Sequence, residues 1–194
     1  MKKLFTLAAA LVCTLSISAQ TVKITKTDGS TLQLQASEIE SIVFEPATAS
    51  PLVYMGNDTV TINNNAAWTY IASDLSYTIT TNSDGTINLT KPQEVYANTV
   101  IGTITQSSYT ISNIAYDEEA GAYVRDYAAD KLTTHVTAVN GGKTTMNADY
   151  VLTTGKVTVK LDANGNCIVT DTYRFGKMPF PISSRFKGIS TAVK

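Results

Sequence analysis

Short runs that alternate apolar and polar side chains follow one another along most of this chain, and they constrain its fold more than any other feature. In residues 156–162, for example, Val157, Val159 and Leu161 alternate with lysine and threonine. A period of two is typical of a β-strand with one buried face, whereas an amphipathic helix repeats about every 3.6 residues. No window shows a clear helical period, and threonine and tyrosine, which favour strands, are abundant. The sequence therefore predicts an all-β protein.

Turn signals separate these runs at short intervals. Asn82-Ser83-Asp84-Gly85, Asn140-Gly141-Gly142 and Asn164-Gly165 each favour a tight hairpin. Strands joined by tight turns indicate an up-and-down antiparallel sheet, and closure into a barrel removes its exposed edges. We therefore favour a barrel, and a two-sheet sandwich is the alternative. The predicted strands span residues 58–63, 67–72, 75–81, 86–90, 98–105, 108–116, 121–128, 131–139, 144–153, 156–162, 166–175 and 180–187.

The apolar side of each predicted strand is expected to face the barrel interior, because successive side chains of a strand point to opposite faces. The closing stretch "GKMPFPISSRFKG" follows this pattern although it carries two prolines. Proline has no N–H group to donate, so Pro179 and Pro181 belong at the start of a strand or on an unpaired edge. The predicted inward residues include Leu75, Tyr77, Ile79, Val157, Val159, Leu161, Phe180, Ile182, Ser184 and Phe186.

The first residues have the pattern of a secretory signal peptide. Two lysines precede an apolar core, and small residues lead to a cleavage site after Ala19. Lipidation at Cys13 is disfavoured because Val12, and not Gly or Ala, stands before it. We therefore expect an exported protein, located in the periplasm, in the cell envelope or outside the cell.

Composition shifts divide the rest of the chain. Two alternating runs around Asp28-Gly29 predict a hairpin, and the stretch "PATASPL" is typical of a linker. The predicted organisation is a signal peptide (1–19), an N-terminal hairpin module (20–45), a linker (46–52), a β-barrel (53–188) and a C-terminal tail (189–194).

The charge and cysteine content exclude several classes of protein. Cleavage after residue 19 leaves 194 − 19 = 175 residues with 15 − 2 = 13 basic and 16 acidic side chains, a net charge of −3. No basic excess is present to bind nucleic acid. No later apolar run reaches the roughly 18 residues of a transmembrane helix. Cys167 alone remains, so an internal disulfide is excluded and the fold depends on its own core.

Residues with catalytic or metal-binding chemistry form no complete motif. His135 is the only histidine, which excludes a multi-histidine metal site, and no G-x-S-x-G sequence is present. Gly141-Gly142-Lys143-Thr144 lacks the first glycine of a phosphate-binding loop, and the Asp162-to-Asn166 stretch lacks the glycine and acidic residue of a calcium loop. Both are interpreted as turns. We expect no enzymatic activity, no metal and no cofactor.

The aromatic residues spread over most strands suggest a function. Such side chains can line a cavity and present hydroxyl groups to a ligand, as in many small-molecule sites. The alternative, which we favour, is cross-strand packing. The candidate cavity residues are Trp68, Tyr77, Ile79, Tyr109, Tyr150, Phe180 and Phe186.

Three features together resemble a known family. They are the leading module "TVKITKTDGSTLQLQASEIESIVFEP", the meander rich in threonine and tyrosine, and the closing "MPFPISSRFKG". The combination is similar to the secreted calycin-like β-barrel proteins of anaerobic Gram-negative bacteria, which share their architecture with the lipocalins. The resemblance covers residues 52–188. It implies a barrel of about eight strands without enzymatic activity, and by fold analogy a cavity for a small apolar ligand. The Gly-x-Trp motif of true lipocalins is absent, since Ala66-Ala67 precede Trp68.

Two hypotheses of function follow. The first is a non-enzymatic secreted or envelope barrel that binds a small apolar ligand in its interior. The second is a surface interaction module that binds glycan or protein through its loops or outer face. In addition, Asp58-Thr59-Val60 resembles the Asp-Ser/Thr-apolar acceptor of a bacterial O-glycosylation system, which makes Thr59 a candidate modification site.

Overall fold

The computed structural model describes residues 21–25, 29–36 and 50–191. They belong to two compact units, the N-terminal hairpin and the barrel, which are described separately. The predicted signal peptide (1–19) and most of the predicted linker (46–52) lie outside the described residues. Within the described part of the chain, no helix is long and apolar enough to cross a membrane.

The N-terminal unit is the predicted hairpin. β1 (Thr21–Thr25) pairs antiparallel with β2 (Thr31–Gln35), with Val22 opposite Leu34. Gly29 lies in the connection with φ 83°, a left-handed conformation that favours glycine over other residues.

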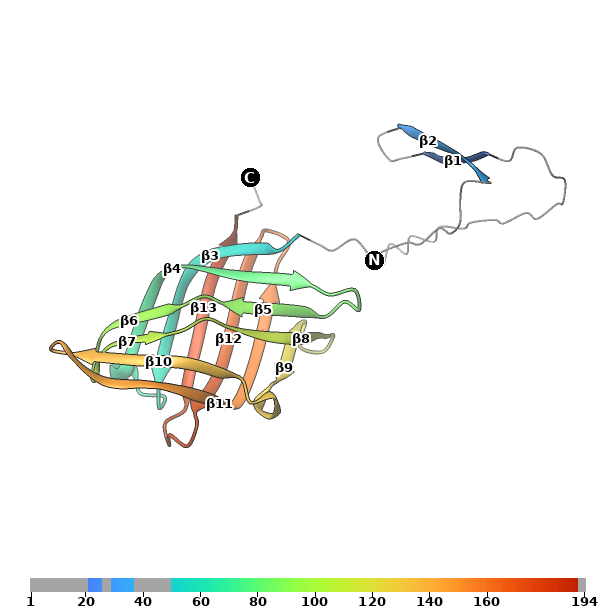
Figure 1. Cartoon of the computed structure of the whole chain (residues 1–194). Coiled ribbons are helices and arrows are strands. Elements are labelled where there is room, and N and C mark those ends of the chain that lie inside the picture. Colours follow the sequence, from blue (N-terminus) through green and yellow to red (C-terminus); the bar gives the residue numbers. More distant parts are fainter. Residues whose placement is uncertain (1–20, 26–28, 37–49, 192–194) are drawn as a thin grey trace. The chain divides into compact units, whose positions relative to one another are not determined.

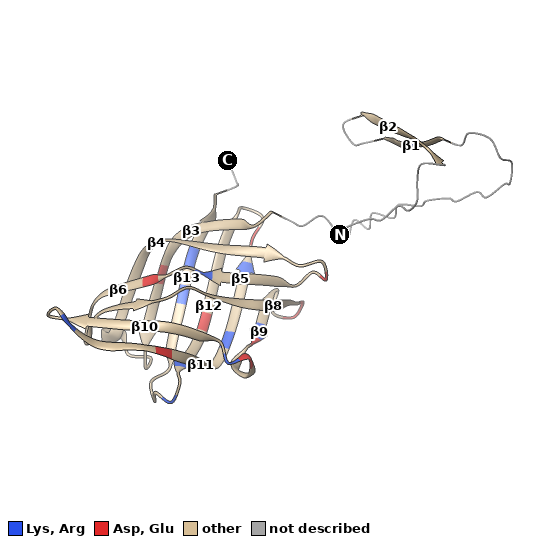
Figure 2. Cartoon of the chain, in the orientation of Figure 1, with Lys and Arg blue, Asp and Glu red and all other residues tan. Residues whose placement is uncertain are grey.

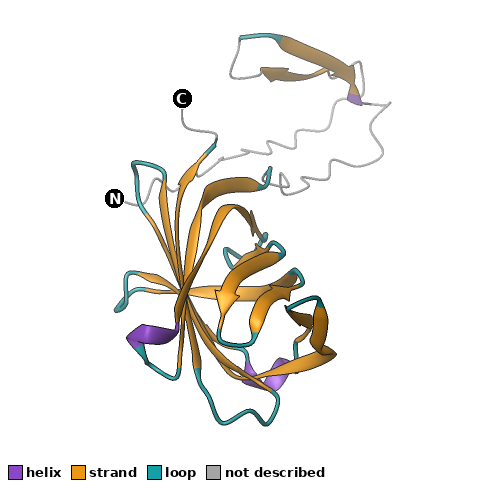
Figure 3. Ribbon diagram, turned by 90° about the vertical axis from the view of Figure 1, so that its left-hand side faces the viewer, coloured by secondary structure: helices purple, strands orange, loops and turns teal. Residues whose placement is uncertain are grey.

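The second unit is a β-barrel, so the all-β prediction and the choice of a barrel are confirmed. Eleven antiparallel strands form one sheet, and two 3₁₀ turns, η2 (Ala66–Trp68) and η3 (Ala128–Asp130), interrupt the connections (Figure 3). The strands are β3 (Leu52–Ile62), β4 (Thr69–Thr81), β5 (Ile87–Lys91), β6 (Glu94–Thr99), β7 (Gly102–Gln106), β8 (Tyr109–Asp117), β9 (Ala122–Asp126), β10 (Thr133–Asn140), β11 (Lys143–Leu161), β12 (Asn166–Phe175) and β13 (Ile182–Ser190).

The eleven strands occupy eight positions around the barrel, because three positions are each shared by two short strands. β5 and β6 share one, β7 and β8 the next, and β9 and β10 the third: β5 pairs with β8 and β6 with β7, and then β8 pairs with β9 and β7 with β10. β11 pairs with both β9 and β10, and β12, β13 and β3 complete the ring back to β4. Figure 1 shows β3, β12 and β13 behind the front wall of β5, β8 and β10. Each position neighbours the next in sequence, as an up-and-down barrel requires.

The interruption between β5 and β6 has a clear local cause. Pro92 directly follows Lys91, and proline has no N–H group to continue the ladder. Lys91 and Glu94 are both buried although they are three residues apart. In a continuous strand, residues three apart point to opposite faces, so the interruption is what allows both side chains to face the interior.

Two pairs of predicted strands are in fact continuous. The predicted strands 67–72 and 75–81 form β4, and 144–153 and 156–162 form β11. Asp74 and Thr154 adopt left-handed conformations there, with φ 56° at each, and the register shifts beside them. These are β-bulges, which bend a strand without ending it, and the sequence signals at these points resemble turns.

The predicted strand 98–105 is also wrong, because it joins two strands that are separate in the structure. Its residues belong to two strands, β6 and β7, joined by a turn at Val100-Ile101. β3 begins at Leu52 and β13 continues to Ser190, slightly beyond the predicted barrel (53–188) at both ends.

The barrel core follows the predicted alternation at most positions. Along β13, Ile182, Ser184 and Phe186 are buried and the residues between them are not. Leu161 and Phe180 are exceptions, with exposed fractions of 36% and 45%. Leu161 is the last residue of its strand, and Phe180 precedes β13, so the alternation does not place them in the core. The last strand was predicted from residue 180, with Pro179 and Pro181 at its start or on an unpaired edge; β13 begins at Ile182, directly after both prolines.

Candidate functional site

An apolar cavity of about 510 Å³ lies at one end of the barrel. At this end β3, β6, β10 and β12 finish and the strands that follow them, β4, β7, β11 and β13, begin. The connections between them therefore surround the opening. All but three of the lining residues are apolar, which suits the burial of a hydrocarbon group. The lining consists of Ile62, Trp68, Thr99, Val100, Ile101, Ile104, Val136, Asn140, Thr145, Met146, Phe175, Met178, Phe180 and Ile182.

The rim of this cavity is aromatic on one side. Trp68 and Phe180 meet edge to face, with ring centroids 6.1 Å apart and an interplanar angle of 84°. On the β6–β7 turn, Val100 is 65% exposed, and its N–H donates to the hydroxyl of Tyr70 on β4 at 3.3 Å. Exposed apolar side chains around an opening are a common feature of ligand-binding and interaction sites.

A smaller cavity of about 30 Å³ lies next to the first, towards the middle of the barrel. The two cavities share Ile62, Ile104, Phe175 and Ile182. The smaller one is also lined by three buried polar side chains and so forms the floor of the site: Tyr96, Gln106 and Tyr173.

Gln106 has an unpaired group at this floor. Its Oε1 accepts a hydrogen bond from the Tyr173 hydroxyl at 2.9 Å, whereas its Nε2 is buried without a hydrogen-bond partner. A buried donor without a partner typically costs about 1–3 kcal/mol. Such a group is therefore a place where a ligand atom would add a favourable contact.

Beyond the floor, a charged cluster fills the centre of the barrel. The Lys91 ammonium lies 3.5 Å from Asp171, 3.6 Å from Glu94 and 3.7 Å from Asp58, and all four side chains are at most 1% exposed. Lys91 also donates to the hydroxyl of Ser184 at 3.2 Å. Three carboxyl groups thus surround one ammonium group in a region without solvent contact.

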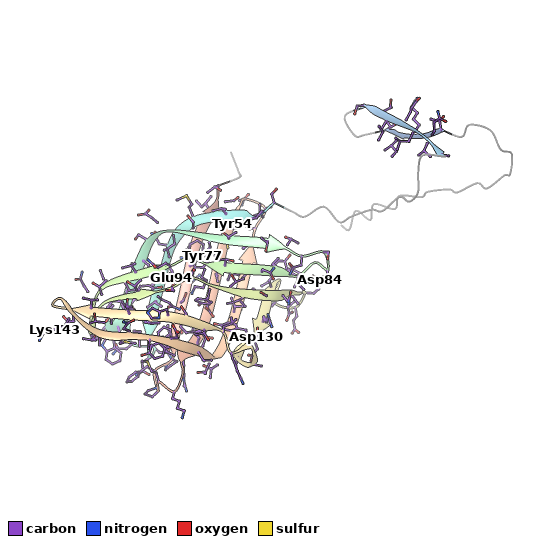
Figure 4. The ribbon with its side chains drawn as sticks, viewed as in Figure 1. Tyr54, Tyr77, Asp84, Glu94, Asp130 and Lys143 are labelled. Carbon is purple, nitrogen blue, oxygen red and sulfur yellow. The ribbon has the colours of Figure 1, made fainter. Side chains whose placement is uncertain are left out.

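Tyrosine hydroxyl groups donate to most carboxyl oxygens of this cluster, whereas Asp58 Oδ1 is buried without a hydrogen-bond partner. Tyr109 and Tyr127 donate to the two oxygens of Asp171 at 2.8 and 2.7 Å. The Tyr77 hydroxyl lies within hydrogen-bond distance of both Glu94 and Asp58, and Tyr96 donates to Glu94 Oε2 at 2.8 Å. Figure 4 shows Tyr77 and Glu94 inside the barrel, between Lys143 at the β10–β11 turn and Asp84 at the β4–β5 turn.

Burial and charge shift the pKa values of the cluster. Burial raises the pKa of Glu94, and Lys91 offsets only part of that effect. Burial alone would lower the pKa of Lys91, but Glu94 and the other acidic groups outweigh it and hold this pKa well above its ordinary value. Burial is also the main cause that raises the pKa of each buried tyrosine: Tyr77, Tyr96, Tyr109, Tyr127 and Tyr173.

Two of the seven predicted cavity residues, Trp68 and Phe180, line the apolar cavity. Tyr77 and Phe186 are not among its lining residues, and their rings stack on each other in the interior with centroids 3.8 Å apart. Tyr109 belongs to the charged cluster instead. These three follow the alternative interpretation, in which aromatic residues pack the core.

Ile79 and Tyr150 are also not among the residues that line the cavity. Ile79 is 1% exposed in the hydrophobic core, and the ring of Tyr150 packs on that of Phe175 at 5.5 Å. The candidate modification site Thr59 lies on β3, opposite Arg185 on one side and Ile71 on the other. Its modification stays a prediction.

The sequence analysis missed the ionisable residues of the interior, although a signal for them exists. Asp171 lies between Val169 and Tyr173 at the spacing of an inward face, and all three are buried. Lys91 likewise follows Ile87 and Leu89 in the same alternation. A charged residue at an inward position of a strand was the available indication of a buried cluster.

The single histidine and Cys167 lie apart from the cavity lining. His135 is exposed on β10, with Nδ1 2.7 Å from Asp149 and Nε2 2.9 Å from Asn147 on β11. Burial raises the pKa of the Cys167 thiol to about 12, so this group remains protonated at neutral pH. Within residues 21–25, 29–36 and 50–191, no group of three His, Cys, Asp or Glu side chains is placed to hold a metal ion.

Comparison with known proteins gives a match at the level of the family. A family model described as "Calycin-like beta-barrel domain" matches residues 52–189, which is more than half of the chain and extends from the start of β3 almost to the end of β13. No curated protein and no solved structure matches the chain.

Proposed function

Because the chain belongs to the calycin-like β-barrel family, we propose that it is a non-enzymatic protein that binds a small, largely apolar ligand in the open end of its barrel. The observation that carries the proposal is the 510 Å³ cavity with its apolar lining. Cavities of roughly 300–1,000 Å³ lined by apolar side chains are typical of small-molecule sites.

The placement of the ionisable groups supports binding over catalysis. A general acid or base must come within hydrogen-bond reach of its substrate. Lys91, Asp58, Glu94 and Asp171 are at most 1% exposed and are not among the residues that line the cavity. A ligand in the cavity contacts mainly hydrocarbon side chains.

The single tryptophan provides a direct test. Trp68 lines the cavity, so its fluorescence should change when decanol or a similar neutral amphiphile binds. We expect Ile104→Phe to weaken binding about tenfold, since a larger side chain at this lining position fills part of the space. Ile71→Phe is the matched control, because Ile71 is 61% exposed on the outside of β4.

Two results would overturn this proposal. The first is a purified protein that yields no ligand on solvent extraction and whose Trp68 fluorescence does not respond to any neutral amphiphile. The second is an Ile104→Phe variant that binds as tightly as the Ile71→Phe control.

We also propose export, on the basis of the predicted signal peptide (1–19). Mass spectrometry of the protein recovered from the producing cells should find a chain that begins at residue 20. An intact chain that retains residue 1 in the cytosol would contradict export.

A second candidate function uses the outer wall. Thr59 and Thr61 on β3 and Arg185 and Lys187 on β13 line a hollow there, and Figure 2 shows basic residues on β13. Hydroxyl and cationic side chains of this kind suit a glycan. A glycan array would test it: binding that is lost in Arg185→Ala supports this function, and an array without binding contradicts it.

A further inference from the structure

The floor of the apolar cavity narrows the chemistry of the ligand. We propose that the ligand carries an uncharged hydrogen-bond acceptor, such as a ketone, amide or alcohol oxygen, which accepts from Gln106 Nε2 while its hydrocarbon part fills the larger cavity. This inference rests on the proposed function and adds the class of ligand.

The backbone around Gln106 fixes the position of its amide. Gln106 is the last residue of β7, where it pairs with Glu94 of β6 on one side and Val136 of β10 on the other. Its Oε1 is held by the buried Tyr173 hydroxyl, which leaves Nε2 as the unpaired donor. The side chain is 2% exposed and lines the small cavity. An acceptor atom that reaches the floor therefore meets a donor already in position.

The hydrocarbon part of the ligand has its own place. Ile62, Ile104, Phe175 and Ile182 line both the small and the large cavity, so an apolar wall runs from the floor to the opening. A molecule with one polar end and an apolar body matches a site with a polar floor and an apolar wall. A ligand that is polar along its length would leave its groups unpaired against this wall.

The charged cluster argues against an anionic head group. Tyr96 lines the small cavity and donates to Glu94, which lies opposite Gln106 on the neighbouring strand. Behind it, three carboxyl groups surround the single ammonium of Lys91. A carboxylate ligand would approach this acidic excess, and like charges in a buried site repel each other. Lys91 is fully buried and already surrounded, so it is not free to neutralise such a ligand.

The test compares ligands of one length that differ in the head group. The full chain is titrated at neutral pH with methyl octyl ketone, decanol, decanoate and decane, and binding is followed by Trp68 fluorescence. We expect the ketone and decanol to bind about tenfold more tightly than decane, which corresponds to one net hydrogen bond. Decanoate should bind more weakly than the ketone.

Gln106→Leu should remove the advantage of the ketone over decane and leave decane binding unchanged. Gln93→Leu is the matched control, because Gln93 is exposed and precedes β6. Thermal unfolding checks that each variant is folded. If Gln106→Leu does not fold, Gln106→Met takes its place, and the comparison of ligands on the unmodified chain still decides.

The possible failures are distinguishable. If decane and the ketone bind equally to the unmodified chain, or if the ketone keeps its advantage in Gln106→Leu, the inference about the head group is wrong and apolar binding stands. Preferred binding of decanoate also overturns it. If no compound changes the fluorescence, the proposed function fails as well.

Discussion

Lys91 holds the only positive charge among three carboxyl groups at the centre of the barrel, and its environment makes it hard to replace. It lies within 3.7 Å of Asp58, Glu94 and Asp171, and none of the four has significant contact with solvent. Burying an ion pair gains little net stability, but removing one partner leaves the other charge uncompensated.

The variant Lys91→Met tests this role. At neutral pH we expect it to lower the free energy of unfolding by about 3–5 kcal/mol, as for other broken buried pairs. Lys187→Met is the control on the exposed face of β13, and its effect should stay within about 0.5 kcal/mol. Urea denaturation measures both.

The same variant has an expected dependence on pH. Burial raises the pKa of Glu94 in the folded state, and the variant loses the lysine that offsets part of this effect. A carboxyl group with a raised pKa in the folded state stabilises the fold as the pH falls, because the folded state then binds more protons than the unfolded state. The difference in free energy of unfolding between Lys91→Met and the unmodified chain should therefore become smaller as the pH is lowered. A difference that becomes larger would contradict this account of the cluster.

At the scale of single elements, the bulge in β11 makes room for a cluster residue. A Cβ atom on Gly155 would lie 2.2 Å from Cε2 of Tyr127, so the tyrosine ring occupies the space that any larger residue would need. The Tyr127 N–H also donates to the carbonyl of Gly155, at 2.8 Å. The ring cannot move aside easily, since its hydroxyl is bonded to Asp171.

Gly155→Ala should therefore destabilise the protein by about 1–3 kcal/mol, the usual range for an overpacked core. The effect should become smaller in a Tyr127→Leu background, where the ring is absent. Lys156→Ala, at the next and exposed position of β11, controls for the strand itself. Equal losses in Gly155→Ala and Lys156→Ala, measured by thermal unfolding, would show that the contact with Tyr127 is not the cause.

The sequence predicted the type of most elements because alternation and turn residues are local signals. It failed where a local signal has two structural meanings. Asp74 and Thr154-Gly155 resemble turns, yet they form bulges within continuous strands. Which of the two occurs depends on whether a neighbouring strand continues to pair, and that information is not local.

The candidate site was only partly predictable for a similar reason. Trp68 and Phe180 were identified by type, since aromatic residues commonly line cavities. The lining by Met146, Met178 and the β6–β7 turn depends on which strand ends meet at one end of the barrel. Gln106 was missed because nothing in its own segment indicates that its amide nitrogen lacks a partner.

At the scale of the whole molecule, the buried titratable groups act together at high pH. The pKa of Lys91 and those of Tyr77, Tyr96, Tyr109, Tyr127 and Tyr173 are all raised in the folded state, from ordinary values of 10.5 for lysine and 10.0 for tyrosine. Above about pH 10 the unfolded chain releases these protons while the folded chain retains them. The folded state then binds more protons than the unfolded state, so stability must fall as the pH rises.

We therefore expect a steep alkaline unfolding transition. Each proton held only by the folded state costs about 1.4 kcal/mol per pH unit, so several groups together remove several kcal/mol between about pH 10 and 11. Urea denaturation at a series of pH values measures the slope. The Tyr109→Phe variant removes one of these protons, so the slope of stability against pH should become smaller by about 1.4 kcal/mol per pH unit. A free energy of unfolding that does not change up to pH 11 would contradict the prediction.

The position of the charged cluster also affects how the proposed ligand would enter and leave the barrel. Lys91, its carboxyl partners and the tyrosines fill the middle of the barrel. The cavity is therefore open at one end of the barrel and closed at its inner end. A molecule bound as proposed would leave by the path on which it arrived, past Trp68, Val100 and Phe180. In that proposal the rim would limit both the rate of entry and the rate of release, whereas contacts at the floor would slow release alone. Under the same proposal, a ligand too long for the cavity would extend its tail past the rim into water.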